Sequence, residues 1–274
     1  MHYRGEFRKM PVVLDSEEKV HYSLWLHDTN SQSNQFISAN DFIGKQVSIH
    51  FEGNIFCKKC GRKTAKSYDQ GFCYVCMRDA PEAAECIIHP ELCRAHLGEG
   101  RDPAWEEAHH NQPHFVYLAA TDIIKVGVTR DTQIPTRWID QGANSAIRLA
   151  ETPNRYLAGV IEVALKSKFA DKTNWRSMLQ NNMDDQIDLL STKMRLHEEL
   201  PTDITQYITE DNRITHLHYP VSQYPQKVIS LSLDKTPDIS GKLTGIKAQY
   251  FLFEGGQVFN IRKHESYQID IGIE

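Results

Sequence analysis

The sequence lacks several features that would place it in a specialised class of protein. No apolar run approaches the ~20 residues needed to cross a bilayer, and the first ten residues do not form an apolar export signal. There is no internal repeat of fixed period and no low-complexity tract. These absences exclude a helical membrane protein and a repeat array. They predict a cytoplasmic protein without a membrane partner.

Positive charge is also scarce, because 31 Lys and Arg face 36 Asp and Glu and leave a formal net charge of −5. That balance argues against indiscriminate coating of nucleic acid. One basic stretch departs from it between residues 45 and 67, where Glu52 is the single acid. The candidate phosphate contacts of this stretch are Lys58, Lys59, Arg62 and Lys63. A solvated charged face explains the same residues.

All six cysteines are confined to one short part of the chain. Two Cys-x-x-Cys pairs, Cys57 with Cys60 and Cys73 with Cys76, are separated by a polar loop. Each pair aims two sulfurs at one point, and four sulfurs complete the tetrahedron that Zn²⁺ prefers. We therefore predict one zinc ion on these four cysteines, in a section that resembles a zinc ribbon. Redox thiols or disulfides are the alternative.

A second cluster of metal-ligand residues follows the first. The pattern Cys-x-x-His occurs twice, starting at Cys86 and at Cys93, and further histidines lie just beyond. Two thiolates and two imidazoles would suffice for a second zinc ion. Its candidate ligands are Cys86, Cys93, His96 and His110. The alternative is that these cysteines pack as small apolar side chains and the histidines are solvated.

Strand-like patterns dominate both ends of the chain. Runs of alternating, β-branched and aromatic residues predict strands at 12–14, 20–26, 46–56, 214–219, 227–233, 242–253 and 257–262. Each end alone has few strands and little to bury, so we expect the two ends to pair, with separate small β-domains as the alternative. The expected parts are a β-rich part at 1–56, a zinc-binding section at 57–114, an α/β domain at 115–200 and a β-rich part at 201–274. The predicted fold class is α+β.

The middle of the chain has a β-β-α-β-α pattern. Its expected strands are 115–119, 123–129 and 146–149, and its expected helices are 135–142 and 155–169. Residues 174–200 are expected to continue as one or two helices before Pro201.

Four short motifs in this middle segment occur in an informative order. They are Phe115-Val-Tyr117, Lys125-Val-Gly127, Thr136-Arg137-Trp138 and Gly159-Val-Ile-Glu162. This order resembles the GIY-YIG nucleases, in which two hairpin strands carry the signatures, the next helix carries an arginine and a later helix carries a metal-binding glutamate. The resemblance implies catalytic roles for Tyr117, Lys125, Arg137 and Glu162, Mg²⁺ at Glu162, and DNA or RNA as substrate. Over most of its length the chain also resembles a bacterial family of unknown function.

The implied residues suit phosphoryl transfer. A phenol can shuttle a proton for an attacking water, an arginine can stabilise charge on phosphoryl oxygens, and a carboxylate can hold Mg²⁺. However, the first signature lacks its glycine, and Lys125 replaces the tyrosine of the second. Glu162 could also lie on the solvated side of its helix. Two other hypotheses therefore stay open: a non-catalytic module in which zinc organises a surface for nucleic acid or protein, and a small-molecule site.

Overall fold

The computed structural model describes residues 1–166, 168–169, 174–182 and 186–274. The helical segments expected at 155–169 and 174–200 include residues 167 and 183–185, which lie outside the described residues. The described part is a mixed α+β fold with more strand than helix, which confirms the predicted class. It divides into two compact units, unit 1 (residues 1–78 and 218–274) and unit 2 (residues 79–217). No helix among the described residues has the length and apolarity needed to span a membrane.

Unit 1 is built on one large sheet. Its strands are β1 (His2–Phe7), β2 (Val12–Leu14), β3 (Val20–Asp28), β4 (Ser33–Ser38), β5 (Gln46–Phe56), β6 (Lys63–Thr64), β11 (Ile229–Leu231), β12 (Asp238–Lys247), β13 (Tyr250–Phe253), β14 (Gln257–Asn260) and β15 (Tyr267–Ile273). They follow the order β11-β14-β13-β12-β5-β15-β1-β3-β2, with β4 beside β3 and β6 beside β5. The short helices are η1 (Asn40–Phe42), η7 (Glu254–Gly256) and η8 (Arg262–His264), and α1 (Tyr74–Asp79) reaches the boundary of the unit.

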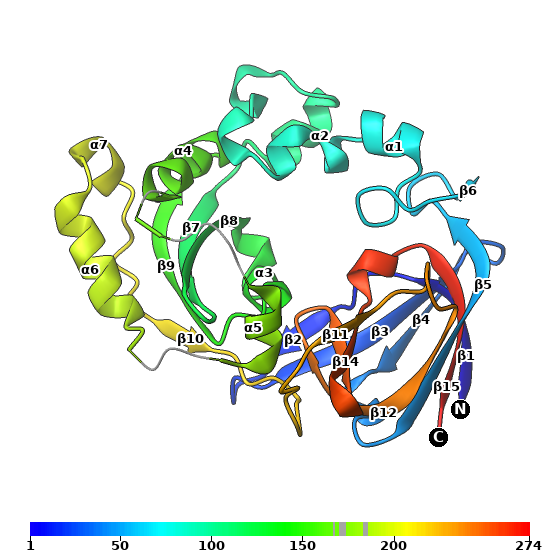
Figure 1. Ribbon diagram of the computed structural model, residues 1–274. Helices are drawn as coiled ribbons and strands as arrows, with labels where there is room; N and C mark the ends of the chain where they lie inside the picture. Colours follow the sequence, from blue (N-terminus) through cyan, green and yellow to red (C-terminus); the bar gives the residue numbers. More distant parts are fainter. Residues whose placement is uncertain (167, 170–173, 183–185) are drawn as a thin grey trace. The chain divides into compact units, whose positions relative to one another are not determined.

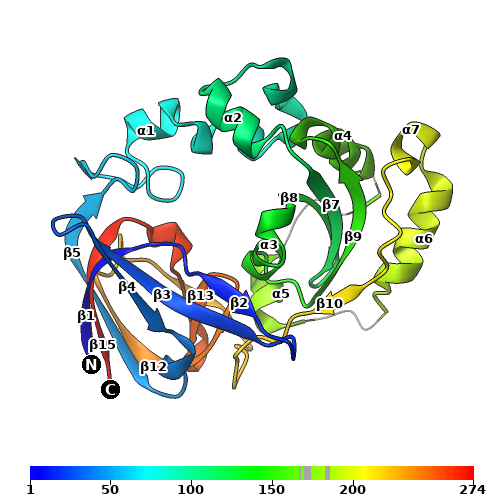
Figure 2. The same cartoon turned by 180° about the vertical axis from the view of Figure 1, so that it is seen from behind.

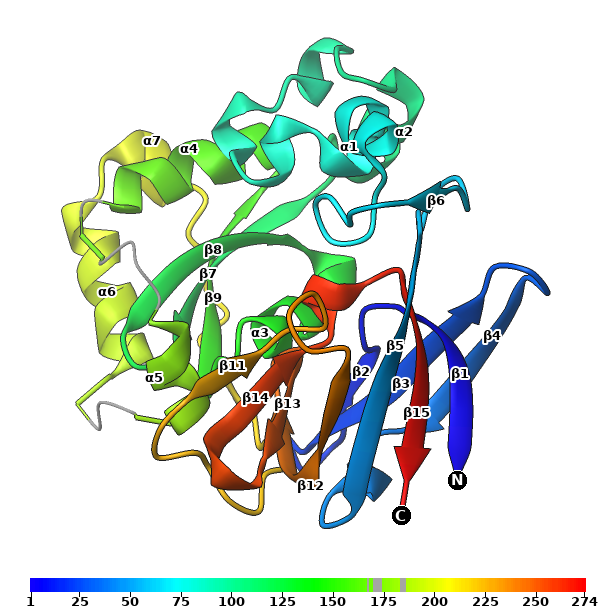
Figure 3. The ribbon, with the colours of Figure 1, turned by 45° about the vertical axis from the view of Figure 1, so that its right-hand side comes forward.

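The two ends of the chain share this sheet. β15 pairs antiparallel with both β1 and β5, and Figure 3 shows these three strands side by side. The amino group of Met1 donates a hydrogen bond to the carbonyl oxygen of Ile273 at 2.8 Å. Along β5 the buried Val47 and Ile49 alternate with exposed polar residues, which is the period-two pattern of a half-buried strand.

The segment 242–253, expected as one strand, is divided in the structure. β12 ends at Lys247 and β13 begins at Tyr250, and the two strands pair with each other. Ala248 occupies the turn with φ of +56°, a conformation that non-glycine residues rarely adopt. Because alanine carries no turn signal, the sequence pattern could not reveal this hairpin.

Unit 2 is built on a four-stranded antiparallel sheet of order β10-β9-β7-β8. Its strands are β7 (His114–Ala120), β8 (Ile124–Arg130), β9 (Ser145–Thr152) and β10 (Ile214–His216). Its helices are α2 (Pro103–His109), α3 (Thr136–Asp140), α4 (Arg155–Lys166), α5 (Trp175–Gln180), α6 (Leu189–Glu199) and α7 (Thr202–Thr205). Its single-turn helices are η2 (Pro81–Ala83), η3 (Glu85–Ile87), η4 (Pro90–Leu92), η5 (Ala95–Leu97) and η6 (Asp131–Gln133).

The two faces of this sheet have different coverings. Val116 and Leu118 of β7 pack with Ile161 of α4 and Leu196 of α6 in one apolar core. The opposite face carries Tyr117, whose ring contacts Trp138 of α3. Figures 1 and 2 show α4 and α6 on one side of the sheet and α3 on the other. The core face therefore fixes the sheet, while the α3 face is where the polar residues of the middle segment meet.

A buried histidine makes the stability of unit 2 depend on pH. His114 is 0% exposed, its Nδ1 lies 2.7 Å from the carbonyl oxygen of Gln112, and its Nε2 is buried without a hydrogen-bond partner among the described residues. Burial lowers the pKa of His114 from 6.5 to about 3. The unfolded chain therefore binds this proton more readily than the folded chain. The stabilisation is complete above pH 6.5 and is lost as the pH falls toward 3.

We expect this single group to lower the free energy of unfolding by about 3 kcal/mol at pH 4 relative to pH 8. Urea unfolding at several pH values should show a weaker acid loss for His114→Gln than for the unchanged protein. His197→Gln on the exposed face of α6 is the matched control and should follow the unchanged protein. Parallel pH profiles for all three proteins would contradict the assignment.

Candidate metal centres and a polar cluster in unit 2

Four cysteines in unit 1 bring their sulfur atoms together. Cys57 follows β5 directly, and Cys76 lies in α1. All four sulfurs lie within 4.8 Å of one another, and the Sγ atoms of Cys60 and Cys73 are 3.8 Å apart. Two sulfurs on a tetrahedral Zn²⁺ with bonds of about 2.3 Å would be about 3.8 Å apart. Since all six cysteines are free thiols, this Cys57 group can hold a metal ion, and its spacing is consistent with zinc.

Backbone hydrogen bonds favour the ionised form of one thiol in this group. Although burial raises the pKa of the Cys57 thiol, N–H groups of Cys60, Cys73 and Lys59 donate to its sulfur and bring the pKa down to about 7. Burial and the neighbouring thiols raise the pKa of Cys76. Four adjacent sulfurs cannot all ionise without a compensating positive charge. A bound metal ion supplies that charge and allows all four to act as thiolates.

A second group with ligand spacing lies in unit 2. It consists of Cys86, Cys93, Glu106 and His110, whose ligand atoms also lie within 4.8 Å of one another. The Sγ of Cys86 and the Nδ1 of His110 are 3.8 Å apart, and His110 Nδ1 also contacts Glu106 Oε2. All four residues are buried. A buried carboxylate beside two thiols is costly without a cation, so a metal ion fits this Cys86 group as well.

The sequence prediction for this group missed Glu106. Glu106 lies in α2 and His110 is the C-cap residue one turn later, so both side chains share one face of the helix. Asp102 caps this helix by accepting a hydrogen bond from the backbone N–H of Trp105, and Pro103 occupies its first turn. Those start signals and the spacing Glu-x-x-x-His could have revealed the ligand pair. His96, a predicted ligand, lies outside the group and stacks on Tyr156 with ring centroids 4.6 Å apart.

The loop that carries Cys86 is fastened to α4. Arg155 donates a hydrogen bond from Nε to the carbonyl oxygen of Cys86 and another from Nη2 to the carbonyl oxygen of Ile87, both at 2.9 Å. One turn further along α4, Gly159 allows the loop backbone to approach closely, since a Cβ there would lie 2.2 Å from the backbone nitrogen of Glu91. The Cys86 group therefore braces the helix that also carries Glu162.

Tyr117 and Arg137 meet on the α3 face of the sheet. Tyr117 is 0% exposed, and its hydroxyl donates to Gln141 Oε1 at 2.6 Å. Burial raises the pKa of Tyr117 to about 12, so the phenol is protonated at neutral pH. The charge of the nearby Arg137 opposes this rise in the pKa. Gly127 on β8 makes room for the phenol, because a Cβ there would lie 2.4 Å from its oxygen.

Glu162 lies close enough for its charge to act on this pair. Burial raises the pKa of its carboxyl, Glu91 raises it further, and the cations Lys166, Arg155 and Arg137 oppose the rise. Glu91 has its own buried oxygen, Oε2, without a hydrogen-bond partner among the described residues. Glu162 is half-buried, so its carboxylate is not freely solvated as the alternative expects.

Lys125 faces the same side of the sheet as Tyr117. In the β7–β8 ladder Ala119 pairs with Lys125 and Tyr117 pairs with Gly127, and directly paired residues share a face. Burial lowers the pKa of Lys125 to about 8, and the nearby carboxylate of Asp122 opposes this shift. The four residues implied by the resemblance therefore all belong to unit 2, three of them linked through charge.

Among the basic residues beside the Cys57 group, Lys58 forms a salt bridge with a buried carboxylate. The ammonium of Lys58 lies 3.1 Å from the carboxylate of Glu265 and 4.4 Å from the centre of the Phe72 ring. Because Glu265 is only 4% exposed, this ion pair has a structural role. Lys59, Arg62 and Lys63 are exposed side chains.

The fold and these sites define a mixed α+β protein with two groups of residues able to hold metal ions. The chain belongs to the family described as "Protein of unknown function (DUF2797)", whose model matches residues 44–269. No curated protein and no solved structure matches the chain.

Proposed function

We propose that this protein is a cytoplasmic zinc protein that binds DNA or RNA and cuts its phosphodiester bonds with Mg²⁺. The observation that carries the proposal is the grouping in unit 2, where the Tyr117 hydroxyl is hydrogen-bonded to Gln141 and the charge of Arg137 acts on both Tyr117 and Glu162. Supporting it, the order β7, β8, α3, β9 and α4 is that of the GIY-YIG nucleases, which the motifs resemble.

Zinc is the metal proposed for both cysteine groups. Four thiolates at tetrahedral spacing suit Zn²⁺, and two thiolates with an imidazole and a carboxylate use ligand types that Zn²⁺ also accepts. Both groups would be structural, since each offers four protein ligands and leaves no open position. A reducing cytoplasm would keep the thiols available.

The residues of unit 2 would divide the chemistry among them. Arg137 would bind the phosphoryl oxygens and stabilise the charge that develops on them. Tyr117, whose hydroxyl is fully buried and protonated, would orient the Arg137 guanidinium. Glu162, with Glu91 beside it, would supply oxygen ligands for Mg²⁺. When bound, that ion would stabilise the leaving oxygen. Lys125 would contact a neighbouring phosphate.

A non-catalytic binding module is the second candidate. The observation that favours it is the burial of Tyr117, whose hydroxyl is already engaged by Gln141. In that case zinc would organise a surface for nucleic acid or a protein partner. Nucleic-acid binding without cleavage in Mg²⁺ or Mn²⁺ would identify this module.

The binding half of the proposal can be tested on the exposed cations. Replacing Lys59, Arg62 and Lys63 with Gln should weaken binding to single-stranded, duplex and branched DNA and RNA by at least roughly tenfold at low salt. The slope of log affinity against log salt should fall by about two to three, because each phosphate contact contributes close to one unit. Lys58 is left unchanged, since its removal would strand the buried Glu265.

The matched control replaces Lys168, Arg195 and Arg213, three exposed cations of unit 2, with Gln. Fluorescence anisotropy over a salt series measures both proteins. Equal losses in the two triple variants would reduce the effect to net charge and contradict a specific basic surface.

A further inference from the structure

Unit 1 contains a cavity that the proposed function does not use. Its volume is about 540 Å³, and it lies between the loop that links the two cysteine pairs and the segment around η8. Three cationic side chains line it, Lys66, Arg262 and Lys263, against one carboxylate, Asp234. The remaining lining is mainly hydroxyl and amide groups, with Tyr267 in the wall. A cavity of this size matches the ~300–1,000 Å³ typical of small-molecule sites.

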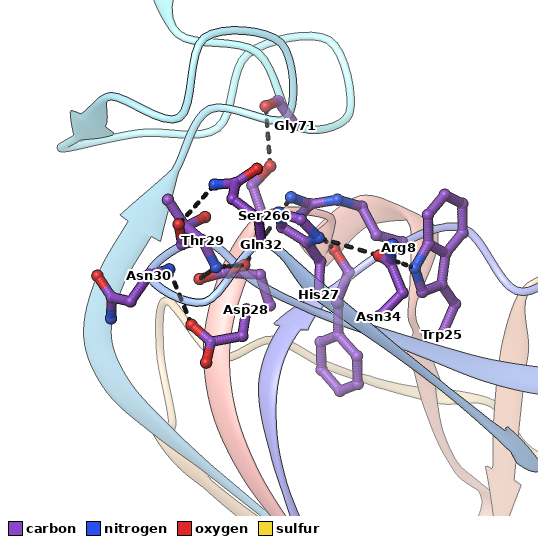
Figure 4. A network of polar contacts seen from close by, with 12 residues as sticks. Arg8, Trp25, His27, Asp28, Thr29, Asn30, Gln32, Asn34, Gly71 and Ser266 are labelled. Carbon is purple, nitrogen blue, oxygen red and sulfur yellow. Dashed lines mark hydrogen bonds and ion pairs between the residues drawn. The ribbon is translucent and has the colours of Figure 1, made fainter.

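Hydrogen bonds hold the loop wall of this cavity in place. The hydroxyl of Ser67 donates to the carbonyl oxygen of Glu265 at 3.2 Å, and that of Ser266 donates to the carbonyl oxygen of Gly71 at 2.9 Å. Figure 4 shows the second of these bonds, between the loop and the end of the sheet. The Nε of Arg262 also donates to Gln70 Oε1, across the cavity lining. These bonds span nearly two hundred residues of sequence, so the wall is fixed by the fold.

The buried His264 joins the other two segments that line the cavity, the one around Asp234 and the one around Asn260. Nδ1 of His264 lies 2.8 Å from the carbonyl oxygen of Asn260, and the backbone N–H of Leu233 donates to its Nε2 at 3.3 Å. This arrangement suits a neutral imidazole with its proton on Nδ1, and burial lowers the pKa of His264 in the same sense. Two of the segments that line the cavity are therefore held together before any ligand arrives.

The side chains that line the cavity carry more positive than negative charge. Asp234 accepts hydrogen bonds from Tyr267 at 2.7 Å and from Ser232 at 3.3 Å, so its oxygens are already engaged. The ammonium groups of Lys66 and Lys263 form no ion pair with a carboxylate in the part of the chain that the structure describes. Two lysines and an arginine in the lining of one cavity, beside hydroxyl and amide groups, are residue types that bind phosphate in proteins.

We propose that this cavity binds the phosphate group of a nucleotide. Lys66 and Lys263 would contact the phosphate oxygens, and the rest of the cavity would hold the attached sugar and base. The phosphate could belong to a free nucleotide or to the end of a strand, which share this chemistry. The inference does not rest on the nuclease proposal, because the residues belong to unit 1 and the test involves no cleavage.

Isothermal titration calorimetry of the full zinc-loaded chain tests the site. The probes are AMP, GMP, CMP and UMP, with adenosine as the ligand that lacks phosphate and inorganic phosphate as the anion alone. A 5′-phosphorylated oligonucleotide and its 5′-hydroxyl counterpart distinguish the strand-end source. We expect at least one phosphorylated probe to bind and Lys66→Gln with Lys263→Gln to weaken it by at least about tenfold, since charge-assisted contacts are lost.

The control variant combines Lys45→Gln with Lys242→Gln, which removes the same charge at the opposite end of β5. It should bind like the unchanged protein, and both variants should melt at the unchanged temperature because the four lysines lie at the surface or near it. Equal weakening in both double variants, equal binding of adenosine and AMP, or binding of inorganic phosphate alone would overturn the proposal. Absence of binding by every probe would do the same.

Discussion

Cys57→Ser should remove one of two zinc equivalents and destabilise unit 1 by roughly 5 kcal/mol or more, because structural zinc sites contribute most of their binding free energy to folding. Cys57 is 1% exposed and holds the junction of β5 with the loop between the cysteine pairs. Its loss leaves the other three thiols, of which one is buried, one half-buried and one exposed, without the cation that lets them ionise together. Element-specific metal analysis and thermal unfolding measure the two effects.

Cys93→Ser is the matched control for this experiment. It should also remove one equivalent, but from the Cys86 group in unit 2, and leave the Cys57 group loaded. Each single variant should therefore retain one equivalent, and the double variant none. A metal-free unchanged protein that remains folded and melts cooperatively would contradict both sites. A single equivalent in the unchanged protein that Cys93→Ser leaves intact would show that Cys86 and Cys93 are packing residues.

Glu162→Gln should lower Mg²⁺-dependent cleavage by roughly a thousandfold while changing nucleic-acid affinity less than threefold. The amide keeps the size of the side chain but loses the negative charge that would hold the ion, and a metal that acts mainly in the transition state contributes little to ground-state binding. Burial and Glu91 raise the pKa of the Glu162 carboxyl, so protonation at acid pH should mimic the variant. Cleavage should therefore decline on acidification at a higher pH than an ordinary carboxyl group would require.

Glu198→Gln, on the exposed face of α6, is the control and should cleave at the unchanged rate. Single-turnover cleavage and anisotropy on the same labelled substrate separate chemistry from binding. Equal activity in Glu162→Gln and Glu198→Gln would remove Glu162 from the reaction. Loss of binding together with cleavage would instead assign Glu162 a structural role in bracing α4.

Sequence patterns within a single segment predicted the strands and the cysteine cluster that depend on neighbouring residues alone. The alternation of 46–56 predicted β5 with its bounds, and the short apolar runs after Phe115 predicted β7 and β8 to within one residue. The two Cys-x-x-Cys pairs predicted a sulfur cluster because each pair fixes its own geometry on a tight turn. These signals need no knowledge of distant parts of the chain.

What the sequence could not predict depends on contacts between distant residues. The sequence predicts a phosphate contact at Lys58, whereas in the structure this residue pairs with Glu265, 207 residues away. The spacing of Glu106 and His110 indicates a shared helical face, but only the fold shows that this face lies beside Cys86 and Cys93. Glu91 had no role in the sequence motifs, and the close packing of its loop on Gly159 brings it near Glu162.

Anomalous X-ray diffraction from crystals of the full chain soaked in Mn²⁺ tests the proposed function most directly. One data set is collected at the zinc absorption edge and a second at a wavelength where the manganese signal dominates. The account predicts zinc peaks among the sulfurs of the Cys57 group and within the Cys86 group, and a manganese peak at the carboxylate of Glu162. Zinc peaks without manganese at Glu162 would contradict the nuclease and leave the binding module. The absence of zinc from both cysteine groups would contradict the account as a whole.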